Sequence, residues 1–137
     1  MKDLMISLLK VAGITFLRFR PVPRVWSIWL ATVNRSCLFY LQHVEAQVVL
    51  GVSLAAVLLQ AAIHRRIGFV RLLGAAHAFW IPMFAWLATR TGEIAAYPDL
   101  QLWLVVLALT NAISLVVDGI DLTRFARGER QPHYSWN

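Results

Sequence analysis

The chain has 137 residues, of which 59% are hydrophobic and only 15% are charged, with a formal net charge of +6. An ordinary soluble domain carries about 25% charged residues, and a chain this short has too little interior to bury so many apolar side chains. The composition therefore excludes a typical soluble domain and predicts one compact membrane protein. We attribute the positive charge to cytoplasmic loops, where Lys and Arg concentrate. Nucleic-acid binding is not expected, because no aromatic-and-basic recognition motif accompanies the charge.

The first seventeen residues predict a helix that lies in the cytoplasmic interface of the membrane. Asp3, Ser7 and Lys10 recur at helical spacing on one face, and apolar side chains occupy the rest. Two prolines follow and interrupt the helix. We therefore expect an interfacial amphipathic segment over residues 1–20, the alternative being an extension of the first membrane span.

Three apolar segments are long enough to cross a bilayer core of about 30 Å, which takes about 20 residues. They cover residues 46–63, 69–88 and 100–122. A fourth segment, residues 25–41, is weaker because Asn34 and Arg35 lie near its middle. It either spans by itself or forms one long helix with the segment that follows.

The distribution of Lys and Arg decides between these alternatives. The turn at residues 64–66 and the C-terminal tail are basic and should be cytoplasmic, whereas the loop at residues 90–99 suits the outside. The arginines before the weak segment also fall inside only if that segment spans. The sequence thus predicts an all-α, polytopic four-helix membrane bundle over residues 21–123 and a basic tail over residues 124–137. Both termini are expected in the cytoplasm, and the membrane is expected to be the inner membrane of a bacterium.

Each predicted span contributes one polar residue near the middle of the membrane. These residues are Asn34, Ser53, His77 and Asn111. Polar groups inside a membrane are costly and are candidates for functional sites. If all four face inward, they form a connected polar layer in the bundle core.

Two of the predicted spans also carry a polar stripe at helical spacing. The stripes comprise Asn111, Ser114, Asp118 and Asp121 on the last span, and Ser53, Ala56, Gln60 and His64 on the span at residues 46–63. Facing each other, they predict a pathway or cavity open to the cytoplasm. The alternative is that these side chains are hydrogen-bonding residues that only hold the helices together.

The functional prediction depends most on His77, because imidazole is the side chain that changes charge near neutral pH. Pro82 leaves the carbonyl of Ala78 without its helical partner. A bent helix with a buried histidine predicts a proton or ligand site. The alternative is a structural histidine bonded to Asn111 or to a backbone carbonyl.

Arg35 is the costliest residue of the predicted spans. A central arginine costs about 2.5–3.5 kcal/mol on insertion scales, so we expect it to pair with an acid or to reach the lipid headgroups. The acids closest to the spans are Glu45, Asp118 and Asp121.

Cofactors and metals are not expected. Cys37 is the single cysteine, so no thiolate metal site can form. Bis-imidazole haem ligation needs two histidines at matching depth on facing helices. The four histidines instead fall at different depths, at positions His43, His64, His77 and His133.

Together these features predict a homo-oligomeric channel or transporter for an ion or a small solute, because one such chain is too small to enclose a wide pathway. The alternatives are a non-catalytic accessory or assembly subunit of a larger membrane complex and, less favoured, a membrane enzyme. The expected partners are membrane lipid and either further copies of the chain or other membrane subunits. The candidate lining residues are His77, Asn111, Ser114, Asp118, Asn34, Ser53, Gln60 and Arg35.

Overall fold

The computed structural model describes residues 2–18, 21–68 and 71–129, and within these ranges every regular element is helical. In chain order the elements are α1 (Lys2–Gly13), the π-helical turn η1 (Ile14–Arg18), α2 (Pro21–Arg35), the 3-10 helix η2 (Ser36–Tyr40), α3 (Val44–Ile67), the 3-10 helix η3 (Arg71–Phe79), α4 (Trp80–Ala88), α5 (Thr91–Ala95) and α6 (Pro98–Ala126). The predicted all-α class is confirmed. The end of the predicted tail, residues 130–137, lies outside the described residues.

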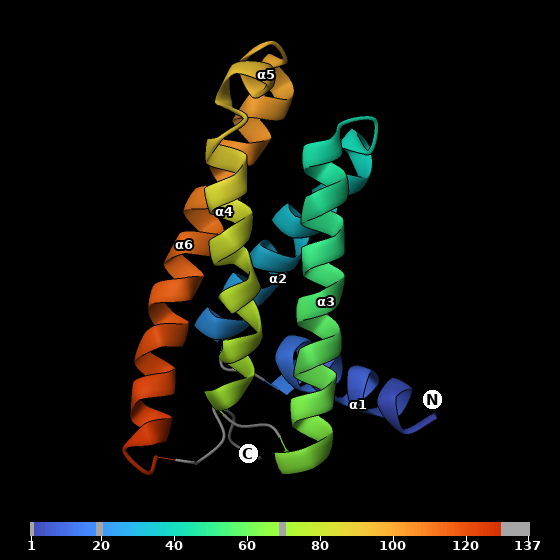
Figure 1. Ribbon diagram of the computed structural model, residues 1–137. Coiled ribbons are helices and arrows are strands. Elements are labelled where there is room, and N and C mark those ends of the chain that lie inside the picture. Colours follow the sequence, from blue (N-terminus) through green and yellow to red (C-terminus); the bar gives the residue numbers. More distant parts are fainter. Residues whose placement is uncertain (1, 19–20, 69–70, 130–137) are drawn as a thin grey trace.

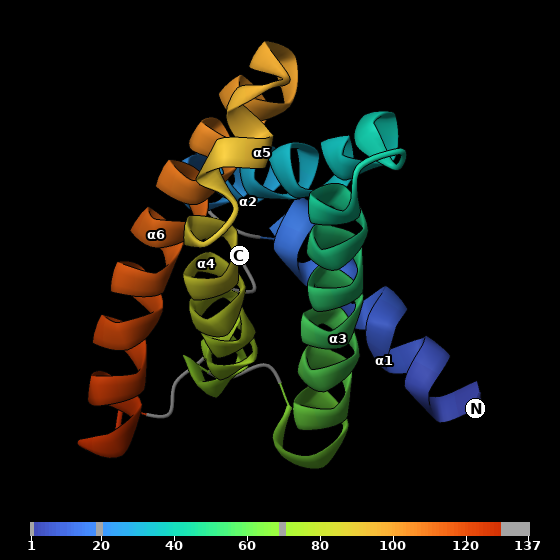
Figure 2. The same cartoon turned by 45° about the horizontal axis from the view of Figure 1, so that its top comes forward.

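Three helical segments lie side by side along one direction (Figure 1). α3 and α6 run downward in this view, and the continuous segment of η3 and α4 runs upward between them. We call the end where α3 and α6 finish the lower end, and the end that carries α5 the upper end. α2 crosses behind these three segments, and Figure 2 shows it reaching from α6 toward the upper part of α3.

Two helices, α3 with 24 residues and α6 with 29, are long and apolar enough to cross a membrane, judged by length and composition alone. The stretch Leu72–Ala88 is a shorter apolar helix. The predicted number of four full-length spans is therefore wrong for the described residues. Residues 25–41 are divided between the 15-residue helix α2 and the turn η2, with polar side chains at the junction, and the described part of the segment at residues 69–88 is one of the shorter helices.

The alternative of one long helix through residues 25–63 is also wrong. The chain turns at residues 41–43, where His43 has an extended backbone (φ −102°, ψ 135°), and α3 begins at Val44. The two later segments, by contrast, are helical throughout their described parts, as predicted.

The segment that carries His77 is not a regular α-helix. η3 is a 3-10 helix of nine residues, whereas such runs seldom exceed about four residues. Pro82 follows in the first turn of α4 and has no amide hydrogen for the Ala78 carbonyl, which its ring would also crowd. The part of the chain before Pro82 is therefore not held in the α-helical register.

Large apolar side chains are packed mainly in the upper half of the bundle. The core comprises Val33, Cys37, Ala46, Val49, Trp80, Met83, Leu87, Ile94, Leu100, Trp103, Leu104 and Leu107. On α6 no residue after Ser114 is buried. Most large buried side chains thus lie in the upper half, and the last turns of α6 are not buried in the single chain.

α1 packs on α3 near the lower end and projects away from the other helices (Figure 1). Ser7, which the sequence places on a polar outer face, is buried, while the apolar side chains of Met5 and Leu9 are exposed. The amphipathic pattern of α1 therefore differs from the predicted one. A position in the membrane interface stays a prediction.

Candidate functional site

Two groups of hydrogen-bonded polar side chains cross the bundle. The upper polar layer contains Asn34, Ser53 and Asn111, and the lower polar cluster contains Gln60, His77 and Asp118. On both α3 and α6 the upper and lower members are seven residues apart. At 1.5 Å of rise per residue, the two groups are separated by about 10 Å along the helices.

A reciprocal pair of amides forms the centre of the upper polar layer. Asn34 Nδ2 donates to Asn111 Oδ1 at 2.8 Å, and Asn111 Nδ2 donates back to Asn34 Oδ1 at 3.1 Å. Ser53 Oγ donates to Asn34 Oδ1 at 3.4 Å. Asn34 is only 8% exposed and Asn111 is fully buried. Three of the four residues predicted to share a layer therefore lie together.

Indole N–H groups also join α2 to α6. They donate from Trp26 to Ser114 Oγ (3.0 Å), from Trp29 to Thr110 Oγ1 (3.1 Å) and from Trp103 to the carbonyl oxygen of Val33 (3.0 Å). Ser114, one of the predicted lining residues, is buried and accepts one of these bonds. The three bonds hold α2 against the upper part of α6.

His77 is the centre of the lower polar cluster. Its Nδ1 lies 2.7 Å from Asp118 Oδ2, and its Nε2 lies 3.1 Å from Gln60 Nε2. An amide nitrogen only donates, so Nε2 accepts from Gln60 and Nδ1 carries the proton that is donated to Asp118. The side chains of His77 and Asp118 are 16% and 17% exposed. The imidazole is thus held in one tautomer between α3 and α6.

His77 does not join the upper polar layer, so the prediction that it lies at the depth of Asn111 is wrong. The combined segment of η3 and α4 is shorter than α6, and its first part lies beside the lower half of α6 (Figure 1). His77 therefore faces Asp118, two turns below Asn111. The polar stripes of α3 and α6 were predicted to face each other directly. Instead, His77 lies between them and contacts both Gln60 of α3 and Asp118 of α6.

Arg35 lies apart from both polar groups and is exposed at the end of α2. Two of its predicted partners are engaged elsewhere, since Asp118 binds His77 and Glu45 binds Arg90. On this surface the side chain can extend toward a polar boundary, as long cationic side chains do. The structure does not bring Arg35 into the candidate site.

Trp80 packs against the ring of His77. The two rings are stacked, with centroids 4.2 Å apart and planes inclined by 8°. Trp80 is 3% exposed, and its indole N–H has no hydrogen-bond partner among the described residues. This stacking was not predicted from the sequence.

Gly74 permits the close approach of η3 to α6. A Cβ atom at this position would lie 2.6 Å from Asp118 Oδ1 and 2.9 Å from Asp118 Cγ. Both distances are shorter than a van der Waals contact, so any other residue would displace the carboxylate that binds His77. Gly74 is therefore required for packing within the chain.

We expect Gly74→Ala to destabilise the protein by about 1–3 kcal/mol, the usual cost of overpacking. Asp118→Ala should relieve part of this loss, because two of the three nearest atoms disappear. Gly51→Ala is the matched control, since nothing lies within 4 Å of its Cβ position and alanine favours a helix. Thermal unfolding in detergent measures all of these variants. A Gly74→Ala protein as stable as the parent would contradict the close contact.

A separate ion pair joins the helices at the upper end. Arg90 Nε donates to Glu45 Oε1 at 2.7 Å, and the Arg90 guanidinium lies over the Trp86 ring, 5.3 Å from its centroid. The hydrogen bond with Glu45 raises the pKa of Arg90 above its ordinary value. The pair connects the start of α3 to the end of α4 and was not predicted, because nothing in the sequence brings these two residues together.

The lower polar cluster places an imidazole within hydrogen-bond distance of a carboxylate. Among the described residues, no group of three or more His, Cys, Asp and Glu side chains is placed to hold a metal ion. The cluster can instead take up a proton at Nε2 of His77, with Asp118 stabilising the resulting imidazolium. Comparisons of the chain with protein-family models, curated proteins and solved structures found no match, so this geometry is the basis for inferring a function.

Proposed function

We propose that this protein is an integral membrane protein that moves protons, alone or together with a small solute, by way of the lower polar cluster, and that it works as a homo-oligomer. The observation that carries the proposal is the hydrogen-bonded arrangement of His77 between Asp118 and Gln60.

The lengths and surfaces of the helices support a membrane location. With 24 residues, α3 extends about 36 Å, enough for a bilayer core of about 30 Å. Large apolar side chains are exposed along α3 and α6, among them Leu54, Val57, Leu58, Leu102, Val105, Leu109 and Ile113. Such side chains would face lipid.

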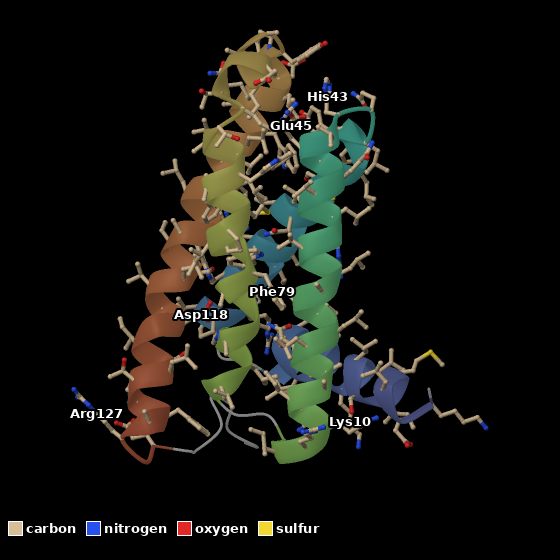
Figure 3. The ribbon with its side chains drawn as sticks, in the orientation of Figure 1. Lys10, His43, Glu45, Phe79, Asp118 and Arg127 are labelled. Carbon is tan, nitrogen blue, oxygen red and sulfur yellow. The ribbon has the colours of Figure 1, made fainter. Side chains whose placement is uncertain are left out.

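The distribution of charge supports an orientation with the lower end in the cytoplasm. Arg65, Arg66, Arg124 and Arg127 all belong to the lower ends of α3 and α6 or to the turn that follows. Figure 3 shows Lys10 and Arg127 at this end, and His43 and Glu45 at the other. Basic residues favour the side that is not translocated.

The hydrogen bonds of His77 suit a group that changes protonation state. In the neutral state, Nδ1–H binds Asp118 and Nε2 accepts from Gln60. In the protonated state, Nε2–H becomes a donor, and the Gln60 amide can turn to present its oxygen. Both states therefore keep two hydrogen bonds, and the carboxylate of Asp118 offsets the positive charge in the low-dielectric interior.

The open lower half of α6 supports assembly into larger complexes. Its residues 115–126 include no buried side chain in the single chain, and several are large and apolar. Further copies of this chain would cover that face and enlarge the space around the cluster. A different membrane subunit would cover it equally well, and this is the second candidate role. Purification in mild detergent distinguishes a homo-oligomer from a heteromeric complex.

Proton flux into liposomes tests the proposal. We expect the parent protein to carry a pH-dependent flux between about pH 5 and pH 8, where imidazole titrates. His77→Gln should assemble normally and lose that flux, because an amide can hydrogen-bond but does not titrate. His43→Gln is the matched control, since His43 lies in the upper turn and contacts Tyr97. Equal flux in the parent and in His77→Gln at every pH would reduce His77 to a structural residue.

A further inference from the structure

We propose that the lower polar cluster exchanges protons with one side of the membrane only, the side on which α3 and α6 end, and that the Trp80 ring closes it toward the other side. This inference rests on the proposed function and specifies from which side its site is reached.

The bundle is closed above the cluster. Trp80 stacks on His77 from the upper side, since the chain rises from η3 into α4, and it is almost completely buried. Beyond it come the upper polar layer, in which Asn111 is fully buried, and core side chains such as Leu107. The amides of the upper polar layer bond to one another, so they offer a passing proton no titratable group.

The bundle is more accessible below the cluster. His77 and Asp118 are both partly exposed. Polar side chains continue from the cluster toward the lower end, with His64 one turn below Gln60 on α3 and Asp121 almost one turn below Asp118 on α6. Titratable side chains are therefore found between the lower end of the bundle and the cluster.

The charged and titratable groups around this route come from each helix packed against it. α6 contributes Asp118 and Asp121, and α3 contributes His64. α1 adds Lys10, whose charge acts on His64. Figure 3 shows Asp118 on the side of α6 toward η3 and α4, between the lower end, marked by Lys10 and Arg127, and Phe79. Acidic and basic side chains thus both lie below the Trp80 ring that closes the site.

Passage to the other side would then require movement of the Trp80 ring. Trp80 is the first residue after η3, and a long 3-10 run inside a helix often marks a hinge. A change of η3 toward α-helical geometry would shift His77 and Trp80 together along the axis of the bundle. Without that movement, the cluster binds and releases protons on the lower side alone.

Two cysteine probes on one face of α6 test this inference in the full-length protein with Cys37→Ala. Asp121→Cys lies below the cluster and Ser114→Cys one turn above Asp118. In liposomes, we expect a membrane-impermeant thiol reagent to label Asp121→Cys from the lower side only and to leave Ser114→Cys unlabelled from both sides. Labelling of Ser114→Cys, or no labelling of Asp121→Cys from the lower side, would overturn the inference.

Variants of Trp80 test the closing ring itself. Trp80→Ala should make Ser114→Cys reactive from the lower side, whereas Trp80→Phe should keep it protected, since the phenyl ring can still stack and the indole N–H bonds no described residue. A folded Trp80→Ala protein in which Ser114→Cys stays protected would contradict the role of Trp80. If Trp80→Ala does not fold, the labelling of the two cysteine variants alone decides.

Labelling does not depend on transport, so the two proposals can fail separately. The expected labelling pattern in a protein without His77-dependent flux would support the closed upper half and contradict the proposed function. His77-dependent flux together with labelling of Ser114→Cys would support the function and overturn the one-sided access.

Discussion

Asp118→Asn is expected to reduce His77-dependent proton flux about tenfold at a given pH. A hydrogen bond to a charged group contributes about 1.5–3 kcal/mol and a neutral one about 0.5–1.5 kcal/mol. The lost difference of about 1.4 kcal/mol corresponds to a tenfold weaker interaction between the two side chains. The asparagine still accepts from Nδ1 of His77, so the fold should persist.

The measurement is flux in liposomes, with the oligomeric state checked in parallel. Asp99→Asn is the matched control, because Asp99 is an exposed acid in the first turn of the same helix. Asp118→Leu should additionally destabilise the protein by about 1–3 kcal/mol, since the Nδ1–H of His77 then lacks its acceptor. Parent-like flux in Asp118→Asn would show that the carboxylate charge has no part in transport.

The second large effect is a loss of stability, which we expect from substitutions in the upper polar layer. Asn34→Leu and Asn111→Leu each leave the opposite amide buried without its reciprocal partner, which costs about 1–3 kcal/mol. Replacing both residues removes both polar groups from the core. The double variant should therefore be more stable than the sum of the single effects predicts.

Thermal unfolding of the four proteins in detergent measures this double-mutant cycle. Ser53 loses its 3.4 Å bond in the double variant, but its hydroxyl can bond to a backbone carbonyl of its own helix. Thr32→Val is a control on α2, because the Thr32 hydroxyl bonds only the preceding turn. Strictly additive losses in the cycle would contradict a direct coupling between the two amides.

The two long helices could be predicted because their apolar stretches exceed the length that a membrane requires. α3 and α6 extend a few residues beyond the predicted segments at each end. The helix boundaries of the less apolar segment at residues 25–41 could not be predicted in the same way. Whether residues 25–41 form a full helix depends on where α2 packs against α6, and the indole bonds that fix this packing join residues far apart in the chain.

The sequence predicted which residues belong to the candidate site better than it predicted which of them are hydrogen-bonded to one another. The midpoint of each predicted segment gives the correct relative depth for Asn34 and Asn111, which are hydrogen-bonded to each other. It fails for His77, since η3 begins at the lower end of the bundle. Gly74 was a usable signal, because a glycine one turn before His77 indicates a close helix contact there.

The central claim is that His77 binds a proton within a cluster formed with Asp118 and Gln60. The most direct test is ¹⁵N NMR of the His77 ring in the reconstituted protein, assigned by comparison with His77→Gln and recorded between about pH 5 and pH 8. We predict a neutral ring at high pH with hydrogen on Nδ1 and none on Nε2, and a second hydrogen on Nε2 as the pH falls. A His77 ring that keeps a single protonation state across this range would contradict the account.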